Sequence, residues 1–146
     1  MRHWEDSVTG LKDIILPVVI PIVEHLPMKH LPKHLQPRYR YLAVEFTLAH
    51  ERSVTREEFQ KACWVSARQL LGDTGSANCG LQVVKFTFNN EHGKAIVRVR
   101  RNTESKARAA IACIAKISDT PAFIFIRGTS GTVRSCEEKY LHGPSL

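Results

Sequence analysis

Two hydrophobic periods follow one another along this sequence, and their order leaves few possible folds. Lys94-Ala95-Ile96-Val97-Arg98-Val99-Arg100 alternates apolar and polar side chains, which is the period of a half-buried strand. Residues 55–72 instead place apolar side chains three and four positions apart, the period of a helix with one buried face. A chain that switches between these periods is expected to form a sheet covered by helices.

Four segments have the composition or the alternation of strands. They are residues 39–46, 81–88, 94–100 and 123–126. Asn89-Asn90-Glu91-His92-Gly93 joins the second segment to the third, and its residue types tolerate the positive φ of a hairpin turn. Gly128 to Thr132 is predicted to be a turn after the fourth strand.

The first helix is predicted to begin at Thr55, which forms a capping box with Glu58. Gly72 is the expected stop, and residues 73–80 then form a polar loop. Six apolar residues share one stripe of this helix: Phe59, Ala62, Cys63, Ala67, Leu70 and Leu71.

Thr103 is the expected N-cap of a second helix. The residues that this helix buries are Ala107, Ala110, Ile111, Ile114 and Ile117. A short last helix is predicted from about residue 133 to residue 141. The order β-α-β-β-α-β predicts an α+β, ferredoxin-like sandwich, with an antiparallel sheet, two helices on one face and an extra C-terminal helix.

Residues 1–37 differ from residues 38–146, which form the predicted ferredoxin-like domain. They contain five of the seven prolines, a density that resists a long helix or a central strand. We therefore expect an extended or loosely ordered N-terminal arm, and Met28 is a hypothetical alternative start.

The charge balance of the chain favours polyanionic partners. Lysine and arginine number 21 against 14 acidic residues, a net charge of +7. A surplus this large on a small domain favours nucleic acid or an anionic surface. The longest apolar run, residues 14–23, is too short to span a bilayer and contains two prolines, and no signal peptide precedes it. We expect a cytoplasmic protein with no membrane partner.

The third strand is the best candidate for binding. Its alternation points Ala95, Val97 and Val99 toward the helices and leaves cations on the open face of the sheet. The full set of candidate RNA-binding residues is Lys33, Arg38, Arg40, Lys94, Arg98, Arg100, Arg101 and Arg134. The alternative is a solvated strand face on which Glu45 neutralises a nearby arginine.

Two further features leave alternatives open, and a third favours one kind of RNA contact. Residues 128–132 together with Arg134 either bind phosphate at a helix start or form a plain turn with a threonine cap. Trp64 lies off the apolar stripe, so it is either an exposed protein-interface anchor or is covered by the arm or the last helix. The third strand has no aromatic residue, which favours contacts with the RNA backbone over base stacking.

No protein active site or metal site is expected. The four aspartates form no paired metal-binding motif, and no nucleophile elbow is present. His30 and His34 are separated by Pro32, which argues against a helical metal site. The four cysteines form no C-x-x-C pair and are predicted to be free thiols.

Three segments together resemble the archaeal ribonuclease P protein component 2 family, whose eukaryotic relatives are subunits of nuclear ribonuclease P and the mitochondrial RNA processing ribonuclease. They are residues 33–42, 93–99 and 130–136, and the likeness extends from about Pro32 to Leu141. The resemblance implies a non-catalytic subunit of the ribonucleoprotein endonuclease that removes the 5′ leader of precursor tRNA. It implies no cofactor on the protein, because the catalytic magnesium is held by the RNA.

The resemblance also implies partners: ribonuclease P RNA, precursor tRNA within the holoenzyme, ribonuclease P protein component 3, and a second copy of the chain. The basic residues would then neutralise RNA phosphates. Two alternatives are a stand-alone RNA-binding module and a ferredoxin-like regulatory domain for a small molecule, because a fold alone does not define a function.

Overall fold

The computed structural model describes residues 32–36 and 38–142. The chain divides into two units, Met1–Pro37 and Arg38–Leu146, and every helix and strand described below lies in the second unit. In the first unit, the N–H of Leu35 closes a turn on the carbonyl oxygen of Pro32 at 2.9 Å. The arm predicted for residues 1–37 otherwise lies outside the described residues and stays a prediction.

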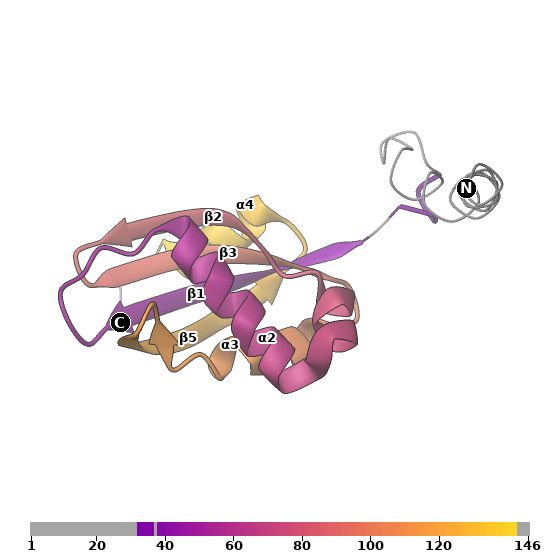
Figure 1. Cartoon of the computed structure of the whole chain (residues 1–146). Helices are drawn as coiled ribbons and strands as arrows, with labels where there is room; N and C mark the ends of the chain where they lie inside the picture. Colours follow the sequence, from indigo (N-terminus) through magenta and orange to yellow (C-terminus); the bar gives the residue numbers. More distant parts are fainter. Residues whose placement is uncertain (1–31, 37, 143–146) are drawn as a thin grey trace, which may run out of the picture. The chain divides into compact units, whose positions relative to one another are not determined.

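A five-stranded antiparallel sheet forms the centre of the second unit (Figure 1). β1 (Tyr39–Leu48) lies in the middle, between β3 (His92–Arg100) and β5 (Thr120–Ser130). β2 (Gln82–Asn89) pairs with β3, and the two-residue β4 (Lys116–Ile117) pairs with the start of β5. The resulting order, β2-β3-β1-β5-β4, is that of a ferredoxin-like sheet with β4 added at one edge.

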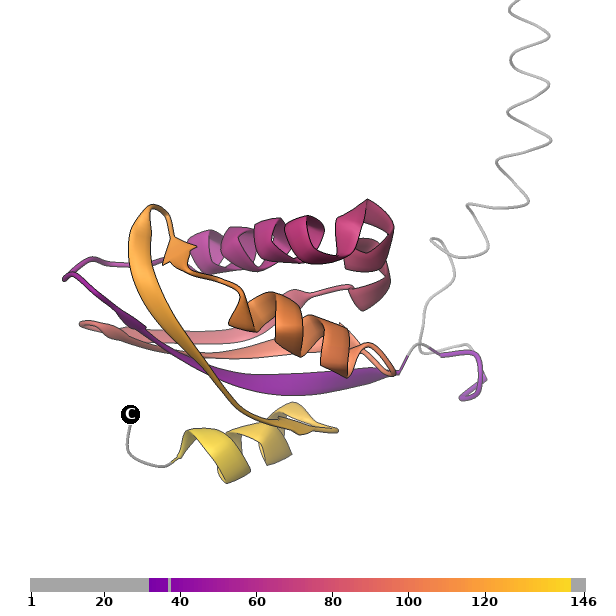
Figure 2. The same ribbon diagram turned by 90° about the horizontal axis from the view of Figure 1, so that it is seen from below.

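Helices lie on both faces of this sheet. α2 (Arg56–Cys79) and α3 (Glu104–Ala112) cover one face, whereas α4 (Val133–Cys136) and the π-helical turn η2 (Glu137–Leu141) lie against the other (Figure 2). The predicted fold class and the extra C-terminal helix are confirmed. The short strand β4 was not predicted.

The main core lies between the sheet and helices α2 and α3. The alternation of β3 is confirmed, because Ala95, Val97 and Val99 are buried on this side. Phe46 of β1 stacks on Phe59 of α2 with ring centroids 5.0 Å apart. Burial of a side chain of this size contributes about 1.5–3 kcal/mol, so these residues hold the helices on the sheet.

The predicted end of α2 is partly wrong. Gly72 breaks the helical geometry as expected, with φ 75° and ψ 177°, but a second helical segment continues to Cys79. This segment ends at Gly80, which has a φ of 57° and donates its N–H to the carbonyl oxygen of Ser76. The composition of residues 73–79 predicted a polar loop, but this segment is helical and its last residue, Cys79, is buried in the core.

Leu70 was predicted to be buried, but its side chain is 47% exposed. Its angular position on the helix favours burial, yet it lies in the turn directly before the break at Gly72. A change in helix direction can carry a residue away from the sheet without changing the sequence period.

The second predicted helix is shorter than expected. α3 ends at Ala112, and Ile114 and Ile117 are buried from the segment that follows it. Ser118 and Asp119 both have positive φ, as a two-residue hairpin turn requires, so β4 forms where the apolar spacing favoured helix. The burial of Ile114 and Ile117 is compatible with either a helix or a short strand, so it does not distinguish the two.

Two local predictions around the helix ends also need correction. Thr103 makes no side-chain cap; its hydroxyl donates instead to the carbonyl oxygen of Arg100 at 2.6 Å. Gly128, Thr129 and Ser130 were predicted to be a turn, but they belong to β5 and pair with Ala43, Leu42 and Tyr41. A β-bulge at Arg127 shifts the register between β1 and β5. Pairing then continues beyond the apolar residues 123–126, to Ser130.

Candidate nucleic-acid interface

The face of the sheet that the sequence suggested was open is covered over its middle by the C-terminal helix. Ala43, Ile96 and Cys136 form a second small core there. Partly buried side chains pack around it, and these are Tyr41, Val84, Val133, Tyr140 and Leu141. The prediction of an open face is therefore wrong at the centre of the sheet, because residues 133–141 supply an apolar side that covers Ile96.

Lys94 lies on the covered part of this face. Its Nζ donates to the carbonyl oxygen of Leu141 at 3.0 Å and lies 3.7 Å from Oε1 of Glu45. The Glu45 carboxylate is buried and its Oε2 also lies 3.6 Å from Arg127. Glu45 does lie beside an arginine, Arg127 of β5, but it is buried and so does not belong to the solvated strand face of that alternative. Lys94 is engaged within the protein.

Five other cations gather where β1 begins and β3 ends. We call this set the arginine cluster: Arg38, Arg40, Arg98, Arg100 and Arg101. The antiparallel register places Tyr39 opposite Arg100 and Tyr41 opposite Arg98. The N–H of Arg101 donates to the carbonyl oxygen of Arg38 at 2.9 Å, which brings the residues after β3 beside those before β1.

The strand register divides the arginine cluster between the two faces of the sheet. Arg98 lies on the same face as η2, and its guanidinium lies 4.4 Å from the centroid of the Tyr39 ring. This cation–π contact holds the guanidinium plane in place. Arg40 lies on the face covered by α3, where its Nε is 3.7 Å from Oε1 of Glu104.

The positive charge of the cluster is largely uncompensated. Within residues 38–142 as described, Glu104 is the one acidic partner of any of its members. Arg38, Arg100 and Arg101 are exposed and form no ion pair with the described residues. Exposed guanidinium groups on neighbouring strand ends suit the phosphates of a folded polyanion, because each offers planar donors that match phosphate oxygens.

The remaining cationic candidates lie apart from this cluster in the sequence. Arg134 is largely exposed and pairs with Glu138 on the same helical turn at 3.0 Å. Thr132 caps α4 by accepting the N–H of Ser135 at 3.1 Å, which confirms the threonine cap of the plain-turn alternative but not its turn, since residues 128–130 belong to β5. Lys33 belongs to the first unit of the chain and is exposed there. Phosphate binding by these residues stays a prediction.

Trp64 is 48% exposed, and its indole N–H donates to the carbonyl oxygen of Leu81 at 2.8 Å. The last helix does not cover it, because that helix lies on the opposite face of the sheet (Figure 2). The arm lies outside the described residues, so that alternative stays open. Sequence reasoning placed Phe123 and Phe125 on a strand but did not identify them as exposed aromatic residues, which they are.

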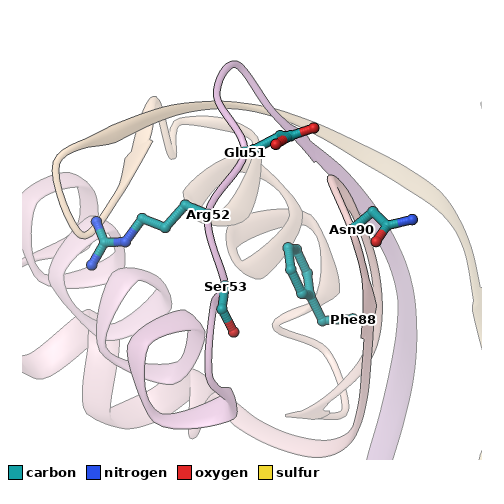
Figure 3. A pocket seen from close by; sticks show the side chains of 5 residues that line it. All are labelled: Glu51, Arg52, Ser53, Phe88 and Asn90. Atoms are coloured by element: carbon teal, nitrogen blue, oxygen red, sulfur yellow. The ribbon is translucent and has the colours of Figure 1, made fainter.

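A hollow of about 380 Å³ lies between the loop after β1 and the turn after β2 (Figure 3). Glu51, Arg52 and Ser53 line it from the loop, and Phe88 and Asn90 from the other side. The Arg52 side chain is held elsewhere, by the carbonyl oxygen of Ser118, the hydroxyl of Thr120 and the carboxylate of Glu58. Without a free cation or a set of converging polar groups, the hollow does not define a ligand class.

All four cysteines are free thiols, as predicted. Burial raises the pKa of Cys63 to about 12 and that of Cys136 to about 11, so neither is a reactive thiolate at neutral pH. Within the described residues no group of three metal-ligating side chains comes together. Within the same residues no helix is long and apolar enough to cross a membrane.

Comparison with known proteins gives a consistent result. Residues 40–141 match the model of the Rpp14/Pop5 family. A Halobacterium salinarum protein named ribonuclease P protein component 2 is 48% identical over 116 residues, covering 80% of this chain and 71% of the relative. The protein of that name from Methanosarcina mazei is 34% identical over 114 residues, covering 78% of this chain and 93% of the relative.

A solved structure shares the fold. One chain in the cryo-EM structure of yeast ribonuclease MRP superposes with a TM-score of 0.51 at 12% sequence identity. The superposition covers 66% of this chain and 76% of that chain.

Proposed function

This chain belongs to the Rpp14/Pop5 family, as its three sequence segments suggested, and on that premise we propose that it is a protein subunit of ribonuclease P. The complete enzyme would be the ribonucleoprotein endonuclease that removes the 5′ leader from precursor tRNA. Relatives from several archaea carry the name ribonuclease P protein component 2, which supports this assignment.

In this proposal the protein is a non-catalytic subunit and the RNA carries the chemistry. The residues that the structure describes bring together no metal-ligating group of three. The magnesium ions of the reaction would be held by the RNA, and the protein would bind no cofactor of its own.

The arginine cluster is the observation that carries the proposed mechanism. Arg38, Arg100 and Arg101 present exposed charge at one end of the sheet, with no acidic partner among the described residues. Contacts of this kind neutralise RNA phosphates and release counterions. Phosphate neutralisation would let the RNA hold its metal-binding geometry at a lower magnesium concentration.

The proposed partners follow from the family resemblance. They are ribonuclease P RNA, precursor tRNA bound within the holoenzyme, ribonuclease P protein component 3, and a second copy of this chain. Trp64, half-exposed on α2, is the candidate residue for a protein contact. Tryptophan, like tyrosine, is enriched at the energetic centres of protein interfaces.

The test is the salt dependence of RNA binding by the full chain with both Arg100→Ala and Arg101→Ala substitutions. These side chains are exposed, so the variant is expected to fold normally. Each lost phosphate contact lowers the log–log salt slope by about 0.7–0.9, so the pair is expected to lower it by about 1.4–1.8. Reconstituted particles should then need more magnesium for precursor cleavage.

Lys61→Ala is the matched control, because it removes an exposed cation from the first half of α2. It is expected to leave the salt slope and the magnesium requirement unchanged. An unchanged slope in the double arginine variant would exclude the cluster as the phosphate-binding surface. Cleavage that needs no added RNA would exclude a non-catalytic subunit.

A further inference from the structure

The outer edge of β5 is an unpaired strand edge. β4 pairs with β5 only at Thr120 and Pro121, and among the described residues no strand pairs with this edge from Phe123 onward. Ala122 donates its N–H outward to the carbonyl oxygen of Ala115 at 2.9 Å. Because backbone groups alternate along a strand, the N–H and C=O groups of Ile124 and Ile126 point the same way.

The side chains along this edge are apolar on both faces of the sheet. Ile124 and Ile126 pack against the main core. Phe123 and Phe125 lie on the other face and are 64% and 43% exposed. A long apolar edge with unpaired backbone groups is a template for pairing with another chain, and proteins usually protect such edges. Pro121 and the bulge at Arg127 protect the two ends of this edge, but residues 123–126 between them carry no proline, charge or bulge.

The charge beside this edge is positive. Arg127, at the bulge, is the one charged residue of β5, and the neighbouring β4 contributes Lys116. Glu45 is a single carboxylate placed between Arg127 and Lys94. An acidic side chain on an added strand would complement this charge.

We propose that the edge of β5 from Phe123 to Arg127 binds an extended segment of another polypeptide by strand addition. The segment would carry apolar side chains at alternate positions and an acidic residue opposite Arg127. Phe123 and Phe125 are spaced by two residues, or about 6.6 Å along the strand, and side chains of an added strand repeat at the same distance. The free backbone donors and acceptors favour a peptide over RNA as the occupant.

The proposal is tested with the full chain and a short synthetic peptide of alternating valine and threonine with glutamate at both ends. Amide hydrogen exchange is measured at Ile124 and Ile126 as the peptide is added. At about ten times the dissociation constant, bound peptide is expected to slow their exchange roughly tenfold. A peptide with proline at alternate positions lacks the required N–H groups and is expected to have no effect.

The variant for this test carries Phe123→Ser and Phe125→Ser, two changes at exposed side chains. It is expected to remain folded and to lose the peptide effect. Leu70→Ser is the matched control, since Leu70 is 47% exposed on α2, away from this edge. It should retain the peptide effect.

Four results would overturn the proposal. The first is exchange at Ile124 and Ile126 that the peptide leaves unchanged, and the second is an equal effect of the proline peptide. The third is slower amide exchange at these two residues when oligouridine is added in place of the peptide, which would assign the edge to RNA. The fourth is amide exchange that becomes slower as the protein concentration alone is raised, which would assign the edge to a second copy of the chain. None of these outcomes bears on the arginine cluster, so this surface is tested independently of the proposed function.

Discussion

At the scale of single residues, Gly93 has the least room for a side chain among the glycines that the structure describes. It pairs with Phe46 across the β1–β3 ladder, and a Cβ atom at residue 93 would overlap the Phe46 ring. That ring also stacks on Phe59 and lies 6.0 Å from the rings of Phe86 and Phe88, measured between centroids. A displaced Phe46 would therefore disturb contacts with both α2 and β2.

Gly93→Ala is expected to lower the free energy of unfolding by about 1–3 kcal/mol, because an inserted methyl group overpacks a closed aromatic cluster. Urea denaturation of both proteins measures the difference. Gly131→Ala is the control, since its new Cβ would meet only the end of the Arg40 side chain, at 3.3 Å. Equal stability of Gly93→Ala and wild type would mean that the aromatic cluster is looser than described.

At the scale of elements, the C-terminal helix decides how much of the sheet solvent reaches. Its apolar residues pack on Ala43 and Ile96, and Lys85 of β2 forms an ion pair with Glu137 of η2 at 2.5 Å. The hydrogen bond from Lys85 lowers the pKa of Glu137 below its usual value of about 4.5. The carboxylate form is therefore favoured by the docked helix.

Because the pKa of Glu137 is lower in the folded state than in the unfolded state, its contribution to stability is present above the unfolded value. It is lost as pH falls through the folded value. Glu137→Gln is expected to be less stable than wild type at neutral pH and equally stable in acid below the folded pKa. Chemical denaturation across pH measures this. Glu138→Gln is the control, because its exposed pair with Arg134 contributes little. If the free energies of unfolding of Glu137→Gln and wild type differ by the same amount at every pH, the contribution of Glu137 comes from packing alone.

At the scale of the whole molecule, the net charge of +7 is distributed unevenly. The arginine cluster occupies one end of the sheet, whereas the cations Lys85, Lys94 and Arg127 are paired with acidic groups within the fold. Uncompensated charge of this kind steers polyanions toward one surface. This arrangement suits a protein that stabilises a folded RNA.

The proposed function predicts that the purified chain, freed of RNA, leaves a precursor tRNA intact. Gel analysis of the substrate after incubation with magnesium measures this. Addition of ribonuclease P RNA and the other protein subunits is the positive control and is expected to release the 5′ leader. Leader removal by the bare chain, persisting after nuclease treatment and repurification, would contradict the proposal.

The sequence was sufficient for those features that depend on local chemistry. The alternation of β3, the capping box at Thr55 and Glu58, and the tolerance of positive φ around Asn90 are properties of neighbouring residues. The order of the elements then restricts the topology to a ferredoxin-like sheet. The positions of Arg98 and Arg100 on one face follow from the same two-residue period.

Only the tertiary structure decided what covers each face and where the helices and strands end. The helical segment after Gly72 and the strand β4 depend on burial against distant residues, which short-range patterns do not contain. The docking of η2 over Ile96 separated the engaged Lys94 from the exposed Arg100, although both residues share one face of β3. Local periodicity sets the direction of a side chain, but its neighbours come from packing between segments far apart in the chain, and that packing determines which cations remain free to bind.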